Sequence, residues 1–455
     1  MDSNHILSLI EKISGYIWGT PLLLLLVGTG VFLTFRLGFL QIRMLPYGLK
    51  LAFFPNKKEK GKGDISHFQA LMTALAATIG TGNIVGVATA VIIGGPGAVF
   101  WMWMSALFGM ATKYAEGVLA VKYREQDPVN GEMNGGPMYY IEKGLGLKWL
   151  GVLFAIFGSI AAFGIGNTVQ TNAVANNMKE SFGISPLITG IILTIFTALV
   201  VLGGIRNIGK VTAIFVPIMA ILYIFGGLLI IILNFDLVPA AFALIFTDAF
   251  TGQAAAGGAI GAVIKYGVAR GLFSNEAGLG SAPIAAAAAK TDYPSRQGLV
   301  MMTSVFIDTL IVCTITGLTL IMGGMYSEEA VNAGSLTNQT FEMFLGKGGS
   351  LIVTIGLLFF AYSTVLGWCY YGEKCFTYLF KKWAVIPYRI AFVIAAFIGA
   401  IVNDLNIIWG IADIMNGLMA IPNLIALLGL SSVVVYETKV FLRQYKKEKL
   451  MKKAG

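Results

Sequence analysis

Two short segments combine glycine with polar residues inside stretches that are otherwise apolar. Residues 76–83 read AATIGTGN, and residues 271–280 read GLFSNEAGLG. If a helix is interrupted inside a membrane, each unpaired backbone group costs several kcal/mol unless a ligand, an ion or another helix pairs with it. Backbone N–H groups at such a break suit a carboxylate, whereas carbonyl oxygens suit a cation or an ammonium group.

The elements that must position these residues are long apolar runs. Of the 455 residues, 56% are hydrophobic and only 12% are charged, against about 25% charged in a typical soluble domain. A helix needs about 20 residues to cross a bilayer core of about 30 Å. The runs are continuously apolar rather than alternating, so they predict helices and not a barrel. Eleven runs are long enough: 16–35, 68–93, 97–121, 149–178, 184–203, 211–233, 256–290, 298–323, 350–379, 385–402 and 405–436.

The positions of lysine and arginine predict the orientation of these spans. With the N-terminus outside and eleven crossings, almost all basic residues fall on the cytoplasmic side, including segment 36–67 and the C-terminal tail. Only Lys12, Lys179 and Lys347 fall outside. Because basic residues favour cytoplasmic loops, we expect a multi-pass protein of the cell membrane with a cytoplasmic C-terminus. Segments 38–56 and 238–252 are expected to lie along the two membrane surfaces.

The ten spans after the first divide into two halves of five, and each half begins with an interrupted span. The predicted units are 1–62, 63–235, 236–437 and a basic tail 438–455. Paired interruptions at corresponding places are the best sequence pointer to the binding site of a transporter. A lone Gly-x-Gly in a membrane helix more often allows close helix packing, so the pairing carries the prediction.

Other classes of protein fit the sequence less well. Both histidines, His5 and His67, lie outside the spans, and the chain has no metal motif, nucleophile elbow or phosphate loop, which argues against a membrane enzyme. No pore loop is repeated, as a channel would need. The basic residues separate apolar runs and do not gather on one domain, so no nucleic acid is expected as a partner.

The stretch GGPGAVFWMWM at 94–104, continued by GMATKYAE at 109–116, resembles the signature of the alanine/glycine:cation symporter family. Residues 79–83, 134–139 and 271–278 support the likeness, which extends from about residue 16 to 440. The resemblance implies a leucine-transporter-type fold, in which two five-helix repeats are inverted relative to each other. It also implies symport of alanine or glycine, in some members D-alanine, with Na⁺ as coupling ion and no other cofactor. Some relatives use H⁺, so proton coupling stays an alternative.

By the pattern of that fold, the substrate carboxylate is expected at the N–H groups of Gly80, Thr81 and Gly82. The ammonium group is expected at carbonyls near Phe273. Gln170 can bind the carboxylate or Thr81, or serve only as a packing contact, and Trp368 is either a pocket wall or a lipid-facing or core aromatic. The full set of expected substrate-site residues is Thr78, Ile79, Gly80, Thr81, Gly82, Asn83, Gln170, Phe273, Ser274, Asn275, Glu276 and Trp368.

The same pattern places Na⁺ between the first and eighth core helices. The expected ligands are all oxygen donors, as a hard cation requires. They are carbonyls of Ala76, Ile79, Phe360 and Ala361 and hydroxyls of Ser363 and Thr364. The hydroxyls could instead bond back to their own helix. Asn83 and Thr78 are further candidates for a second ion or for the substrate.

Ionisable residues within spans are functional candidates by default. Glu276 lies in the second interruption and could organise the loop, contact substrate or ion, or pair with Lys265 or Arg270. Asp308 has no obvious partner, and Asp413 is a candidate for an outer gate. The protein is expected to act as a monomer.

Overall fold

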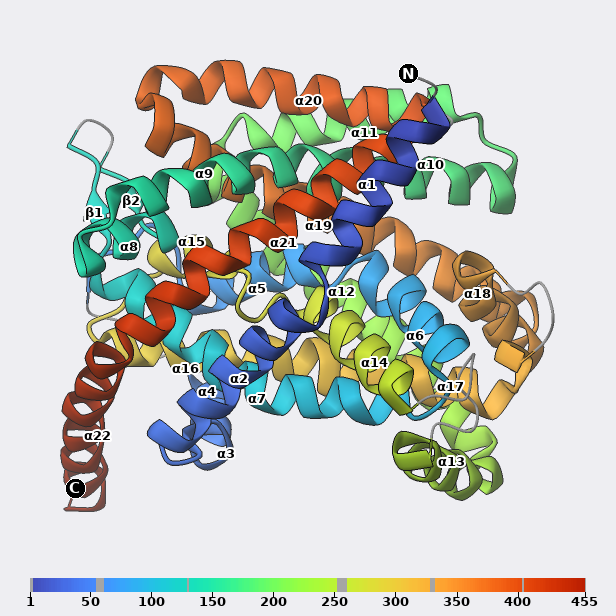
Figure 1. The fold of residues 1–455 in the computed structure, drawn as a ribbon, viewed down its shortest axis with the longest axis horizontal. Helices are drawn as coiled ribbons and strands as arrows, with labels where there is room; N and C mark the ends of the chain where they lie inside the picture. Colours follow the sequence, from blue (N-terminus) through green and yellow to red (C-terminus); the bar gives the residue numbers. More distant parts are fainter. Residues whose placement is uncertain are drawn as a thin grey trace.

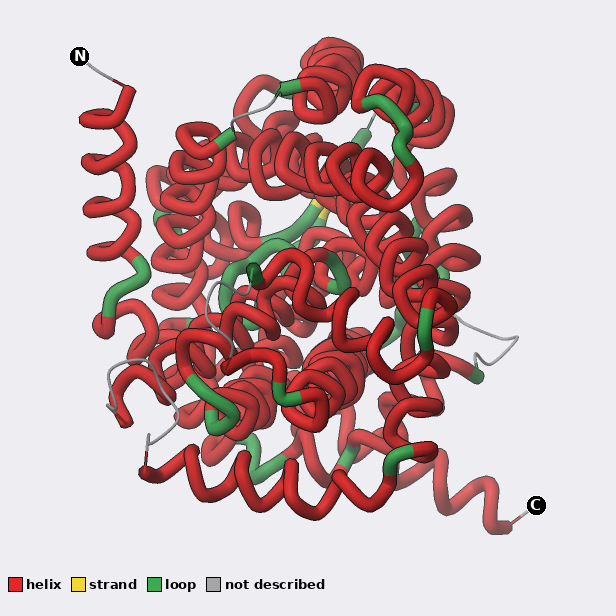
Figure 2. Tube along the Cα trace, turned by 90° about the vertical axis from the view of Figure 1, so that its right-hand side faces the viewer, coloured by secondary structure: helices red, strands yellow, loops and turns green. Residues whose placement is uncertain are grey.

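The computed structural model describes residues 3–54, 61–128, 131–251, 260–327, 332–402 and 405–454, and these fold almost entirely as helices. In Figure 1, α7 (Ala98–Lys122), α9 (Lys148–Phe163) and α20 (Val385–Ile401) run roughly horizontally, α21 (Asn406–Gly429) crosses the view diagonally, and α22 (Ser431–Ala454) runs down to the C-terminus. Figure 2 gives the view at 90°, in which the two chain ends lie on opposite sides. Residues 55–56 of the expected surface segment 38–56, residue 252 of the segment 238–252 and residues 256–259 of the expected span 256–290 lie outside the described residues.

The N-terminal part forms four helices that lead into the main bundle. They are α1 (Ser3–Ile17), α2 (Thr20–Arg36), α3 (Leu40–Arg43) and α4 (Leu45–Phe53). Together α1 and α2 give an apolar stretch that is longer than the predicted span 16–35. Helix α1 packs on α21 (Asn406–Gly429), and α2 packs on α7 (Ala98–Lys122).

The rest of the first half starts with a broken helix. A capping box starts α5, because Ser66 accepts from the Gln69 N–H and the Gln69 side chain accepts from the Ser66 N–H. The elements are α5 (His67–Thr78), η1 (Gly82–Gly86), α6 (Val87–Gly94), α7, β1 (Glu125–Gln126), β2 (Met133–Asn134), α8 (Pro137–Leu145), α9 (Lys148–Phe163), η2 (Gly164–Thr168), α10 (Val169–Phe182), α11 (Pro186–Val201) and α12 (Gly204–Leu233). Strands β1 and β2 form an antiparallel hairpin.

The second half likewise contains a helix that is broken into two pieces, α14 (Ile260–Asn275) and α15 (Ala282–Ala287), joined by a loop. Its elements are η3 (Phe235–Leu237), α13 (Val238–Thr251), α14 (Ile260–Asn275), α15 (Ala282–Ala287), α16 (Pro294–Val305), η4 (Phe306–Cys313), α17 (Thr314–Gly323), η5 (Met325–Ser327), α18 (Ala333–Leu345), α19 (Lys347–Phe380), η6 (Lys382–Ala384), α20 (Val385–Ile401), α21 and α22 (Ser431–Ala454). Helix α18 packs on α19, and its Thr337 hydroxyl donates to the Ile84 carbonyl oxygen of η1 at 3.4 Å.

Apolar side chains form both the core and much of the outer surface. Helix α7 packs between α14 and α16, and α19 packs against α9 and α12. On the outside of α11 and α12, Leu199, Ile221 and Phe225 keep 67%, 67% and 63% of their surface exposed. Such exposed apolar bands mark a surface that meets lipid rather than water.

Among the described residues, six helical stretches are long and apolar enough to cross a membrane, or seven if the bent pair α5 and η1–α6 counts as one span. The sequence predicts eleven spans. Helices α11 and α20, with 16 and 17 residues, are apolar but shorter than this threshold. The protein is therefore a multi-pass membrane protein.

Candidate functional site

The first interrupted helix bends by 55° between α5 and the η1–α6 segment. Ile79 leaves the helical conformation with φ −76° and ψ 95°. The Gly80 N–H, expected at the substrate carboxylate, donates to Asn83 Oδ1 at 3.0 Å. A Cβ atom on Gly80 would lie 2.7 Å from Thr364 Oγ1, so glycine is what lets α19 approach the break.

The second interruption is shorter than the sequence suggests. Helix α14 continues to Asn275, and the loop begins at Glu276, which has φ 54°. Gly271 thus lies inside a helix, where a Cβ would sit 2.3 Å from Ser105 Oγ of α7. At this position glycine allows helices to pack closely, and the expectation that the chain unwinds from residue 271 is wrong.

Buried polar groups hold the loop between α14 and α15. The carboxylate of Glu116 on α7 accepts from the N–H groups of Gly278 and Gly280, both at 3.1 Å. The Asn423 amide of α21 donates to Glu116 Oε1 at 2.7 Å and to the Gly278 carbonyl at 2.8 Å. Lys113 Nζ donates to the Glu276 carbonyl at 3.1 Å. Lys113 and Glu116 therefore both bind the loop from one face of α7.

The two interruptions meet at a small cavity. Its lining comes from both broken helices and from α9–η2–α10, α19 and α21. The lining residues are Ala77, Thr78, Gly80, Thr81, Gly82, Ile165, Gln170, Phe273, Glu276, Thr364, Trp368 and Asn416. The space open to the centre of a water molecule is about 20 Å³, enough for about one water molecule. A ligand here must be small and must displace side chains slightly.

Eight of the twelve expected substrate-site residues line this cavity, and four do not. Ile79 is buried without lining it. Asn83, Ser274 and Asn275 bond to η4 instead. The Asn275 amide donates to Thr309 Oγ1 at 3.1 Å.

Gln170 and Trp368 both face the cavity from buried positions. Trp368 is only 1% exposed, and its indole N–H donates to Glu276 Oε1 at 3.2 Å. The Gln170 amide donates to the Ile165 carbonyl at 3.0 Å and approaches Thr81 Oγ1 at 3.5 Å. Trp368 is therefore a cavity wall and not a lipid-facing ring. The other Glu276 oxygen accepts from Ser281 at 2.5 Å.

Four of the six expected Na⁺ ligands lie together beside the cavity. Thr364 Oγ1 lies 3.1 Å from the Ala76 carbonyl oxygen and 2.9 Å from the Phe360 carbonyl oxygen. Ser363 Oγ lies 3.4 Å and 2.9 Å from the same two oxygens. These donors come from α5 and α19, which are far apart in the sequence. Both hydroxyls donate to the Phe360 carbonyl oxygen of their own helix, so the back-bonding that the sequence left open is present. Oxygen donors are also the ligand type that a hard cation takes, and Thr364 lines the cavity.

Asp308 joins the two broken helices, a role that the sequence did not reveal. It is fully buried on η4. Its carboxylate accepts from the Asn83 amide at 2.7 Å and from the Ser274 and Thr309 hydroxyls, both at 2.8 Å. Asn83 belongs to the first interruption, and Ser274 lies in the last turn of α14, before the second.

Beyond Phe273, the cavity borders two larger spaces. Phe273 also lines a space of about 200 Å³ with Trp18, Arg270 and Asp413, and one of about 530 Å³ with Thr81 and Gly82. The Arg270 guanidinium lies 5.9 Å from the centre of the Phe273 ring. Phe273 thus lies between the small cavity and these two spaces, which together we call the vestibule.

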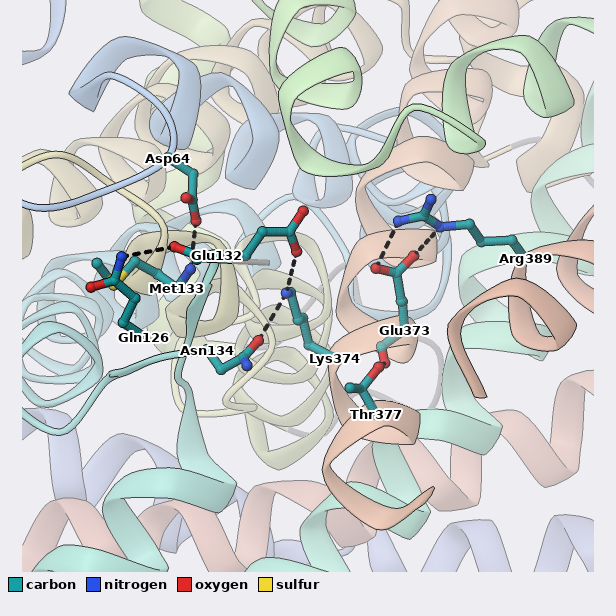
Figure 3. Close-up of polar contacts among 10 residues, drawn as sticks. Asp64, Gln126, Glu132, Met133, Asn134, Glu373, Lys374, Thr377 and Arg389 are labelled. Atoms are coloured by element: carbon teal, nitrogen blue, oxygen red, sulfur yellow. Dashed lines mark hydrogen bonds and ion pairs between the residues drawn. The ribbon is translucent and has the colours of Figure 1, made fainter. Parts of the chain in front are cut away.

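At the end of the protein that carries the β1–β2 hairpin, polar side chains form a network around the hairpin (Figure 3). Lys374 of α19 donates to Glu132 at 3.0 Å and to the Asn134 side-chain oxygen at 2.8 Å, and Asp64 accepts from the Met133 N–H at 2.7 Å. Beside it, Arg389 of α20 pairs with both carboxylate oxygens of Glu373 at 2.6 and 3.0 Å.

Arg124 adds a second set of ties at this end. Its guanidinium donates to the carbonyls of Ala287, Ala289 and Lys62 at 2.6–2.8 Å. Burial lowers the pKa of Arg124 from its usual value, but an arginine stays charged at neutral pH. The segment before α5 is thereby fastened to the segment after α15.

Comparisons with known proteins give the family and the fold that this chain is similar to. A model of the sodium:alanine symporter family matches residues 3–454. A sodium/alanine symporter of Methanococcus maripaludis is 61% identical, over 95% of this chain and 97% of the relative. An uncharacterized transporter of Haemophilus influenzae is 56% identical, over 96% and 97% of the two chains. The solved structure of MhsT in complex with L-phenylalanine is similar in fold, with a TM-score of 0.57, 14% identity and coverage of 84% and 99%.

Proposed function

The chain belongs to the sodium:alanine symporter family, and we propose that it takes up alanine or glycine with Na⁺ by alternating access. The position of Thr364 is the main support for this proposal. Its hydroxyl lies among the four oxygens of the candidate Na⁺ site, and the same residue lines the small cavity. An ion bound there would fix α5 against α19, and that contact shapes the cavity wall. Ion binding and substrate binding would then depend on each other.

The driving force is sufficient for accumulation. One charge that crosses 100 mV provides about 2.3 kcal/mol, before the Na⁺ gradient is added. One Na⁺ per neutral amino acid would therefore support more than about tenfold accumulation. Because the cavity is enclosed by residues of one chain, we propose that the monomer is the transporting unit.

We also propose that the eleven predicted spans form an N-terminal helix and two inverted repeats of five. The positions of the interrupted pairs α5–α6 and α14–α15 at the start of each half support this arrangement. The hairpin end would face the cytoplasm, as the distribution of lysine and arginine suggests. The vestibule beyond Phe273 would then open outward.

Counterflow of radiolabelled alanine in proteoliposomes tests the function directly. A carrier shows saturation and accelerated exchange, whereas a channel shows neither. Varying Na⁺ and pH independently separates Na⁺ coupling from H⁺ coupling. Uptake that follows a proton gradient at constant Na⁺ would contradict Na⁺ coupling and favour the proton-coupled alternative.

Trimming the cavity wall should widen the range of substrates. The variants Phe273→Ala and Trp368→Ala remove large rings that limit the cavity, so valine should gain about tenfold or more in uptake relative to alanine. One methylene that fits an apolar pocket is worth about 1–3 kcal/mol. Competition of alanine uptake by larger amino acids measures the effect. Phe225→Ala, on the lipid-facing surface, is the control, and unchanged selectivity in both cavity variants would contradict the assignment.

A further inference from the structure

Two side-chain oxygens at the small cavity lack a hydrogen-bond partner among the described residues. They are Gln170 Oε1 and Asn416 Oδ1. Both residues line the cavity, and they are only 4% and 2% exposed. A buried acceptor without a partner costs about 1–3 kcal/mol, and most buried polar atoms in native proteins are paired. A pair of such acceptors around one cavity indicates that a ligand supplies the donors.

The orientation of the Gln170 amide is fixed by its neighbours. Its nitrogen donates to the Ile165 carbonyl oxygen at 3.0 Å, and a carbonyl cannot pair with the amide oxygen. The oxygen is therefore turned the other way, and a Cβ on Gly80 would lie 3.8 Å from it. Gly80 itself lines the cavity. The Gln170 oxygen is thus directed at the first interruption as an acceptor.

Asn416 is the less expected member of the pair. It lies on α21, three residues after Asp413, so the two side chains share one helix face. Within the part of the chain that the structure describes, its side-chain oxygen Oδ1 is buried and has no hydrogen-bond partner. The lining of the cavity also includes Glu276, whose carboxylate accepts from Trp368 and Ser281. The lining residues therefore offer two acceptor oxygens without partners, from Gln170 and Asn416, and these suit a cationic group with several N–H donors.

We infer that Asn416 is a substrate-binding residue, and that its amide oxygen and that of Gln170 receive the primary ammonium group of the amino acid. This inference rests on the proposed function. It moves the ammonium group from the backbone carbonyls near Phe273 to side chains of α10 and α21. It also defines the substrate class as primary amines, because an N-methyl group removes one N–H donor and adds bulk between the two amides.

The test compares Asn416→Ala and Asn416→Asp with the wild-type protein in proteoliposomes, using alanine and N-methylalanine. Asn416→Ala should raise KM for alanine by about tenfold or more, the usual scale for losing a hydrogen bond to a charged group. It should also reduce discrimination against N-methylalanine. Asn416→Asp keeps an acceptor oxygen and should hold KM within about threefold of wild type. Thr189→Ala removes another buried, unpartnered hydroxyl on α11 and should change neither quantity.

Three outcomes would overturn the inference. The first is an Asn416→Ala protein with wild-type KM and wild-type discrimination. The second is a larger KM in Asn416→Asp than in Asn416→Ala, which would show that the amide donates to the carboxylate. If Asn416→Ala does not fold, Asn416→Ser supplies the same comparison, and unchanged discrimination there is the third. Failure of the wild-type protein to accumulate alanine would instead refute the proposed function.

Discussion

Replacing Ser363 and Thr364 together by alanine should raise the Na⁺ concentration for half-maximal alanine uptake by about 100-fold. The two hydroxyls converge on the Ala76 and Phe360 carbonyl oxygens at 2.9–3.4 Å. Losing an oxygen that contacts a charged group costs about 1.5–3 kcal/mol, and 1.4 kcal/mol corresponds to a factor of ten. Initial uptake rates over a wide range of Na⁺ concentrations measure the change.

Thr340→Ala is the matched control for that experiment. The Thr340 hydroxyl is buried and donates to the Leu336 carbonyl of its own helix at 2.8 Å, and Thr340 does not line the cavity. Its loss should leave the Na⁺ requirement unchanged. If the double variant keeps the wild-type Na⁺ requirement as well, the hydroxyls of Ser363 and Thr364 only bond back to their own helix, and the ion site lies elsewhere.

Asp308→Ala should abolish alanine uptake, with a loss of 100-fold or more at equal protein level. The change removes the carboxylate that accepts from Asn83, Ser274 and Thr309 and leaves Asn83 and Ser274 only their longer contacts of 3.3 Å. At about 1–3 kcal/mol for each unpaired group, the two interrupted helices would no longer keep their relative position. Asp308→Asn keeps one acceptor oxygen and should retain more activity. Uptake in proteoliposomes and thermal melting in detergent report function and stability separately.

Asp248→Ala provides the comparison for Asp308. Asp248 is also a buried carboxylate, and it accepts from the Gly97 N–H at 2.8 Å, but it does not line the cavity. We expect this variant to lose stability while its KM for alanine stays the same. An Asp308→Ala protein with uptake close to wild type would show that the two interruptions do not depend on this carboxylate.

The sequence predicts the family and the helical membrane architecture well. Both rest on local information, namely long apolar runs and the motif that begins at Gly94, and the family assignment is confirmed over residues 3–454. The first interruption is also local, because the glycine and polar residues around Gly80 leave little to stabilise a continuous helix. The second interruption is only partly determined by the local sequence. From the sequence alone, Gly271 cannot be distinguished from a glycine that interrupts a helix. In the structure it lies inside α14 and allows close contact with Ser105.

The polar partners inside the bundle could not be predicted in the same way. Asp308 and Asn83 are separated by 225 residues, and Glu116 and Asn423 by 307. No periodic pattern links such pairs, because their contact depends on how the helices pack. Asn416 has the same difficulty, since a single asparagine in an apolar helix gives no sign of what it faces.

Helix α21 presents three polar residues at three depths of the protein. Asp413 lines the vestibule, Asn416 lines the small cavity, and Asn423 holds the loop before α15 through Glu116. At 1.5 Å per residue, these positions span about 15 Å of one rod. A tilt of α21 would therefore move a wall of the vestibule, a wall of the small cavity and the loop before α15 together. The vestibule side and the loop side of the protein would then be coupled by the movement of one helix, without a series of side-chain rearrangements between them.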